Sequence, residues 1–146
     1  MRTVTSATSV DQAKEYIEQI KSQDAAKYID MIDVLTFMCH SASTSRSWWH
    51  DDDGKPEERN FGELIALIHS EVSEAMEGGR KDTQDEHCPE YRSVEIELAD
   101  ALIRIFDLAY AANLDLGEAF MAKWQYNLTR EDHAKEQRQS EGGKQF

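Results

Sequence analysis

Apolar residues at helical spacing are the feature that most constrains the fold of this chain, and one acidic residue interrupts their pattern. One stripe of a helix with about 100° per residue contains Leu64, Leu67, Ile68, Val72 and Ala75. Glu71 falls inside that stripe. A carboxylate in an apolar interface has to be expelled, protonated, paired with a cation or bound to a metal ion. The position of Glu71 therefore indicates either a metal site or an ion pair inside an interface.

Two acidic pairs share one spacing: Glu71 with Glu74, and Glu97 with Asp100. Residues three apart lie on the same face of a helix, so each pair presents two carboxylates together. The 22 residues between Glu74 and Glu97 allow one helix to end and another to begin. Four carboxylates that converge from two helices predict an all-oxygen site. Mg²⁺ is the cation we expect there, with Mn²⁺ as the alternative.

The second acidic pair has a competing interpretation. Glu97 and Asp100 share a narrow polar strip with Arg104 and Asp107, beside a wide apolar arc of the same helix. That strip is either a face turned to solvent or the polar seam of a nearly buried helix. Arg104 either reaches a phosphate group or pairs with Asp100 or Asp107, and we favour the pairing.

Strand-like alternation is absent over any useful length, and the spacing predicts an all-α bundle of about five helices with a single core. Their expected ranges are 9–20, 24–40, 60–79, 90–113 and 116–136. Capping-box patterns at Ser9 and Asp115 begin the first and last of them. A serine-rich break over 41–47 ends the second helix, and Gly78-Gly79 suits the end of the third.

The chain has the length of one domain, 146 residues. We expect that domain over residues 9–136, with a flexible N-terminus over 1–8 and a flexible polar tail over 137–146.

The formal net charge of −13 restricts the partners of this chain. It argues against binding in a nucleic-acid groove and against an anionic membrane surface, because both need basic residues. A phosphorylated small molecule is compatible with it, since a bound Mg²⁺ inverts the local field. Two cysteines do not make a disulfide framework, and no apolar run approaches the ~20 residues of a membrane span. We therefore expect a cytoplasmic protein.

The ordered series of motifs resembles the all-α nucleoside triphosphate pyrophosphohydrolases, specifically their MazG-like branch. The first motif region reads NFGELIALIHSE over 60–71 and closes with EGGRK over 77–81. The second reads ELADALIR over 97–104. DLGEA over 115–119 then leads to Lys123, Asn127 and Arg130. The resemblance covers about residues 60–130.

This resemblance implies hydrolysis of a (deoxy)nucleoside triphosphate between the α- and β-phosphates, which yields a monophosphate and pyrophosphate. Glu71, Glu74, Glu97 and Asp100 would hold Mg²⁺, and Glu71 or Glu74 would also orient or deprotonate the attacking water. Lys123, Asn127 and Arg130 would contact phosphates, with a helix-end charge as the alternative for Arg130. It also implies that bundles pair, so we expect a homodimer or a homotetramer.

Trp48, Trp49 and His50 precede the first motif. An aromatic ring beside a triphosphate site can stack on a nucleobase, and relatives in the resembled family use aromatic and histidine residues from this region for the base. We therefore expect base binding from these three residues. Core packing of at least one tryptophan is the interpretation that we favour.

Other classes of protein fit the sequence less well. A di-iron carboxylate bundle needs Glu-x-x-His pairs, and none of the five histidines has a glutamate three residues before it. Zinc binding by Cys39-His40 and His87-Cys88 lacks the usual ligand spacing. A non-catalytic acidic helical module that binds a partner protein remains the alternative from another functional class.

Overall fold

The computed structural model describes residues 8–21 and 23–130, and in this part of the chain it is all-helical, as the sequence predicts. Its five helices are α1 (Val10–Lys21), α2 (Ala26–Ser45), α3 (Phe61–Lys81), α4 (Ser93–Ala111) and α5 (Leu116–Thr129). No β-strand occurs among the described residues, which form only two isolated bridges, His50 with Pro56 and Gln84 with Arg92. The expected flexible segments at 1–7 and 137–146, and the expected end of the last helix beyond 130, lie outside the described residues.

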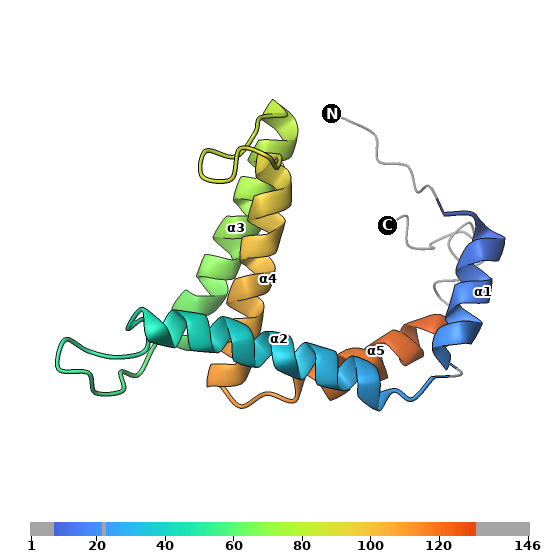
Figure 1. The fold of residues 1–146 in the computed structure, drawn as a ribbon, viewed down its shortest axis with the longest axis horizontal. Helices are drawn as coiled ribbons and strands as arrows, with labels where there is room; N and C mark the ends of the chain where they lie inside the picture. The colour runs from blue at the N-terminus through green and yellow to red at the C-terminus, as the bar shows by residue number, and fades with distance from the viewer. Residues whose placement is uncertain (1–7, 22, 131–146) are drawn as a thin grey trace, which may run out of the picture.

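The helices form two arms that meet where α2 crosses α4 (Figure 1). One arm is the antiparallel pair of α3 and α4, joined by the loop over 82–92. The other arm is α2 with α5 packed along it. α1 lies at the far end of this second arm. Within the described part of the chain, no helix is both long enough and apolar enough to cross a membrane.

The helix starts show which capping predictions hold. At α1 the Ser9 N–H donates to Gln12 Oε1 over 3.0 Å and the Gln12 N–H donates to Ser9 Oγ over 3.2 Å, which confirms the capping box. At α3 the side chain of Asn60 accepts from the Glu63 N–H. The same prediction for α5 is wrong, because the Asp115 side chain makes no capping hydrogen bond.

Two predicted helix ends are also wrong. α2 continues through the serine-rich segment to Ser45, whose hydroxyl donates to the Ala42 carbonyl three residues earlier in the helix. α3 runs past its glycines to Lys81, and Asp82 adopts the left-handed conformation (φ 56°) and donates its N–H to the Gly78 carbonyl.

Gly78 serves the contact between α3 and α4 rather than the end of α3. A Cβ atom at this position would lie 2.7 Å from Ser93 Oγ and 2.9 Å from the Val94 backbone nitrogen. Since real Cβ atoms do not approach backbone atoms so closely, the absence of a side chain lets the two helices meet at this end of the arm.

The orientation of α4 decides between the two interpretations of its polar strip. Arg104 and Asp107 turn towards neighbouring helices, with side chains 31% and 17% exposed. Leu98 and Leu102 on the apolar arc are instead 51% and 52% exposed. The solvent-facing interpretation is therefore wrong, and the strip is a polar seam inside the arm.

The core of a single chain is correspondingly thin. No described side chain is less than 2% exposed, and the buried apolar residues are mostly small: Cys39, Ala75, Ala101, Leu108, Ala109 and Met121. Large apolar side chains remain on the surface of every helix. Such extensive exposure is typical of a protein that associates through these faces.

We predict that Gly78→Ala lowers the free energy of unfolding by about 1–3 kcal/mol, the usual cost of overpacking a contact. Gly79→Ala is the matched control, because its Cβ would meet only Val94 Cγ2 at an ordinary 3.7 Å. The control should be neutral or stabilising by up to about 1 kcal/mol, from helix propensity. Urea unfolding of both variants checks this, and equal stability of the two would contradict the close approach.

Candidate functional site

The structure brings together three of the four predicted carboxylates. Glu71 on α3 and Glu97 and Asp100 on α4 each offer one oxygen, and these oxygens all lie within 4.8 Å of one another. We call these three residues the acidic cluster. Glu71 is only 7% exposed, so its predicted burial is confirmed. The antiparallel pairing of α3 with α4 is what places carboxylates so distant in sequence side by side.

Glu74 lies at the margin of the acidic cluster. It is exposed, and with Glu97 it lines a groove between the end of α3 and the loop over 82–92. Its negative charge nevertheless acts on Glu97. Glu74 is therefore one helical turn outside the cluster, on the side open to water.

Arg104 pairs with the buried glutamate. Its Nε donates to Glu71 Oε1 over 2.5 Å. The expectation that Arg104 pairs with Asp100 or Asp107 is wrong, because the facing helix offers the nearer carboxylate. The Arg104 guanidinium also lies 5.9 Å from the ring centroid of Trp48, within the range of a cation–π contact.

The acidic cluster holds its carboxylates in an unfavourable environment. Burial raises the pKa of Glu97 first, and the charges of Glu74, Glu71 and Asp100 raise it further. Burial and the charge of Glu71 likewise raise the pKa of Asp100, against the opposite effect of Arg104. Both carboxylates would thus gain from a nearby positive charge.

The donor set of the acidic cluster suits a hard divalent cation. All three groups are carboxylates, the ligands that Mg²⁺ and Mn²⁺ prefer over nitrogen and sulfur. Among the described residues, these three carboxylates share one ion pair, that of Glu71 with Arg104, so a divalent cation would relieve the remaining repulsion. The residues present therefore fit the metal that the sequence motifs imply.

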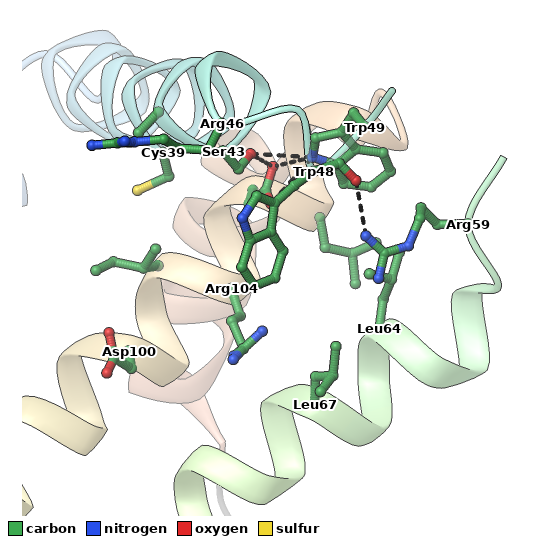
Figure 2. A pocket seen from close by; sticks show the side chains of 14 residues that line it. Cys39, Ser43, Arg46, Trp48, Trp49, Arg59, Leu64, Leu67, Asp100 and Arg104 are labelled. Atoms are coloured by element: carbon green, nitrogen blue, oxygen red, sulfur yellow. Dashed lines mark hydrogen bonds between the residues drawn. The ribbon is translucent and has the colours of Figure 1, made fainter. Parts of the chain in front are cut away.

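A pocket of about 360 Å³ adjoins the acidic cluster between α2, α3 and α4 (Figure 2). Asp100 and Arg104 of α4 line the pocket. Asp100 also belongs to the acidic cluster, and Arg104 pairs with its Glu71. Further polar and aromatic lining residues are Asp107 of α4 and, from α2 and the segment that follows it, Ser43, Arg46, Trp48, Trp49 and Arg59. Figure 2 shows the Arg59 guanidinium donating to the Trp48 carbonyl, over 2.9 Å.

Asp107 organises the inner wall of this pocket. Its carboxylate accepts from the Trp49 indole N–H over 3.0 Å and from the Ser43 hydroxyl over 2.9 Å. The His40 Nδ1 lies 2.8 Å from the same carboxylate. Trp49 is therefore held by its polar edge, and only the structure reveals the roles of Asp107, Ser43 and His40. The sequence signal for Asp107 was its place on the polar strip, whereas nothing in the sequence linked His40 to it.

The other predicted base-binding residues are placed differently. Trp48 is 50% exposed beside the pocket opening. His50 is not among the residues that line the pocket, and its backbone forms the bridge with Pro56. Arg46 and Arg59 also line the pocket, although neither belongs to a motif recognised in the sequence.

The predicted phosphate contacts on α5 lie away from the acidic cluster within one chain. α5 packs against α2, in the arm that does not contain the cluster (Figure 1). Lys123 Nζ and Arg130 Cζ lie 4.6 and 5.6 Å from the ring centroid of Tyr126. Asn127 is exposed on the same helix. The structure thus does not bring these three residues to the pocket of their own chain.

Comparison with known proteins identifies no relative: no family model matches the chain, and neither does any curated protein or solved structure. The resemblance to MazG-like enzymes therefore stays an inference from the motifs.

We predict that Glu97→Gln stabilises the metal-free protein at pH 7. The folded-state pKa of Glu97 is raised, so the folded protein binds more protons than the unfolded chain between the ordinary and the raised pKa. Stability therefore falls as pH rises through that window. Glu97→Gln removes this loss of stability, because glutamine does not ionise. Thermal unfolding in a chelator should show a higher Tm for the variant at pH 7, and the difference should vanish below about pH 4.

Glu95→Gln is the control, and its effect on the Tm at pH 7 should have the opposite sign. Its hydrogen bond with Arg92 lowers the pKa of Glu95, so this carboxylate contributes stability above its ordinary pKa that is lost as pH falls. The control should lower the Tm at pH 7. A Glu97→Gln variant that also loses stability at pH 7 would show that the cluster is not under charge repulsion.

Proposed function

We propose that this chain is a Mg²⁺-dependent nucleoside triphosphate pyrophosphohydrolase. It would cleave a (deoxy)nucleoside triphosphate between the α- and β-phosphates and release a monophosphate and pyrophosphate. The observation that carries the proposal is the acidic cluster of Glu71, Glu97 and Asp100 directly beside a pocket with tryptophan and arginine walls. Mn²⁺ is the alternative cation, because it accepts the same oxygen ligands.

The roles of the carboxylates follow from their exposure. Glu71, Glu97 and Asp100 would hold Mg²⁺, with Glu74 at the open side. When bound, Mg²⁺ polarises phosphate oxygens and lowers the pKa of bound water. The exposed Glu74 is well placed to meet bulk water, and Glu71 lies among the other carboxylates. One of these two glutamates of α3 would orient the attacking water and take its proton.

The pocket supplies the chemistry for the rest of a nucleotide. Its Trp48 and Trp49 rings offer flat apolar faces for a base, with His50 in the adjoining segment. Arg104, Arg46 and Arg59 supply forked donors of the kind that bind phosphate oxygens. A volume near 360 Å³ is within the range of small-ligand sites.

Self-association is part of the proposal. α5 carries Lys123, Asn127 and Arg130 away from the pocket of their own chain, so these residues would reach a triphosphate from a second copy. An apolar groove of about 430 Å³ runs between α2, α4 and α5. Three of its large side chains, Met31, Leu102 and Phe120, are each more than half exposed. We propose a homodimer or homotetramer that covers this groove.

One observation favours a second candidate, a non-catalytic acidic module that binds another protein. The Glu71–Arg104 ion pair gives the buried carboxylate a structural role without any metal. Such a module would keep the fold and the ion pair but would turn over no nucleotide.

We predict pyrophosphate release when the protein is incubated with Mg²⁺ and a panel of (deoxy)nucleoside triphosphates. Glu71→Gln should retain the helical circular dichroism signal and lower kcat by at least about 100-fold, the scale of a lost acid–base group. Glu95→Gln, an exposed residue of α4 outside the cluster, should keep full activity. Orthophosphate as the sole product would exclude the proposed bond cleavage, and absence of any turnover would favour the binding module.

We also predict that the protein is at least dimeric at about 10 µM by light scattering after size exclusion. Leu102→Glu should shift it to monomer, because a charge in a covered apolar face costs several kcal/mol. Val10→Glu is the control, since Val10 is 70% exposed at the start of α1 and lies outside the groove. A wild-type monomer would contradict the proposed association, and so would an unchanged assembly of Leu102→Glu.

A further inference from the structure

Arg104 connects the acidic cluster with the pocket. On one side its Nε binds Glu71 Oε1 over 2.5 Å. On the other side its guanidinium lies 5.9 Å from the Trp48 ring centroid. Glu71 is a cluster residue and Trp48 a pocket wall, so one side chain contacts both parts of the site.

The guanidinium pairs with a carboxylate that a metal ion would also need. Glu71 is buried, and its carboxylate forms an ion pair with Arg104. A divalent cation among Glu71, Glu97 and Asp100 would bring two further positive charges close to the guanidinium. Like charges at such separations repel strongly where the surroundings are partly buried, so the two cations disfavour each other.

The Trp48 ring can hold the guanidinium by a cation–π contact after it leaves Glu71. Its indole is 50% exposed and lies at the pocket, and a tryptophan face is the most favourable ring for a cation. Arg104 can thus keep this contact while it gives up Glu71. Its donors would then face the pocket rather than the acidic cluster.

We propose that Arg104 is a counter-ion that competes with the divalent cation for Glu71, and that cation binding releases its guanidinium from Glu71 to the anionic part of the substrate while the contact with Trp48 is kept. This inference rests on the proposed metal site. An anion in the pocket attracts Arg104 away from Glu71, and a cation in the cluster binds better once Arg104 has left. By linkage, the two ligands therefore favour each other's binding. The ion pair therefore keeps the Glu71 carboxylate neutralised until both ligands arrive.

Cation affinity without nucleotide tests the competition directly. We expect Arg104→Gln to bind Mn²⁺ about ten-fold more tightly than the wild type, measured by electron paramagnetic resonance of free Mn²⁺, since a repelling charge is removed. Arg104→Lys keeps the charge without the fork and should stay within about three-fold of the wild type. Equal or weaker binding by Arg104→Gln would overturn the proposal, because Arg104 would then position Glu71 for the metal.

Thermal unfolding gives a second readout of the same competition. Without metal, Arg104→Gln leaves Glu71 buried without its partner and should lower the Tm. Saturating Mg²⁺ should raise the Tm of this variant by more than it raises that of the wild type, because the tighter site gains more from the ligand. A smaller increase in the variant would contradict the competition.

Tryptophan fluorescence of the wild type keeps the test independent of whether Arg104→Gln folds. Mg²⁺ should change the emission as the guanidinium moves on the Trp48 ring, and Trp48→Phe should abolish the change. Trp124→Phe is the control on α5 and should retain it. Saturation with Mg²⁺ without any change in Trp48 emission would overturn the proposed release.

The outcomes separate this inference from the proposed function. If the wild type binds neither Mn²⁺ nor Mg²⁺, the metal site fails and the inference fails with it. If the wild type binds the cation and releases pyrophosphate but Arg104→Gln binds no more tightly, only the inference fails.

Discussion

The arrangement of the site depends on the ion pair between Glu71 and Arg104, the charged contact that the antiparallel arm of α3 and α4 encloses. A buried carboxylate is costly unless a cation faces it. The pair therefore restricts how α3 and α4 can rotate about their axes. Once Arg104 faces Glu71, its neighbours on the strip, Asp100 and Asp107, must also turn inward. One contact thus aligns both the acidic cluster and the wall of the pocket.

The same rotation sends the apolar arc of α4 outward. Leu98 and Leu102 remain about half exposed, and α2 and α5 place large apolar side chains in the same groove as Leu102. A polar seam inside a thin arm is a poor source of stability, because hydrophobic burial is the dominant favourable term in folding. The orientation of α4 therefore produces both the candidate site and the exposed apolar surface. Association would supply the burial that the single chain lacks.

Prediction from sequence succeeded where local periodicity was enough. The helical class and the burial of Glu71 follow from spacing, and so does the capping box of α1. It failed where tertiary contacts override local signals. Gly78 resembles a helix end, yet α3 continues to Lys81, and the glycine instead allows the close approach of Ser93. The serines at the end of α2 resemble a break, yet the Ser45 hydroxyl is satisfied within the helix and the Ser43 hydroxyl donates to Asp107 of α4.

By itself, the sequence determined that helices form and that two of them carry carboxylates on one face, since both properties depend on spacing within a single segment. Only the tertiary structure decided which side chains these charged residues contact. Arg104 of α4 meets Glu71 of α3, and Asp107 meets His40 of α2 and Trp49 of the segment that follows α2. These contacts join residues tens of positions apart, and their energies depend on burial and orientation that no local pattern encodes. The packing of α2, α3 and α4 therefore converts a row of charges into a site with a pocket.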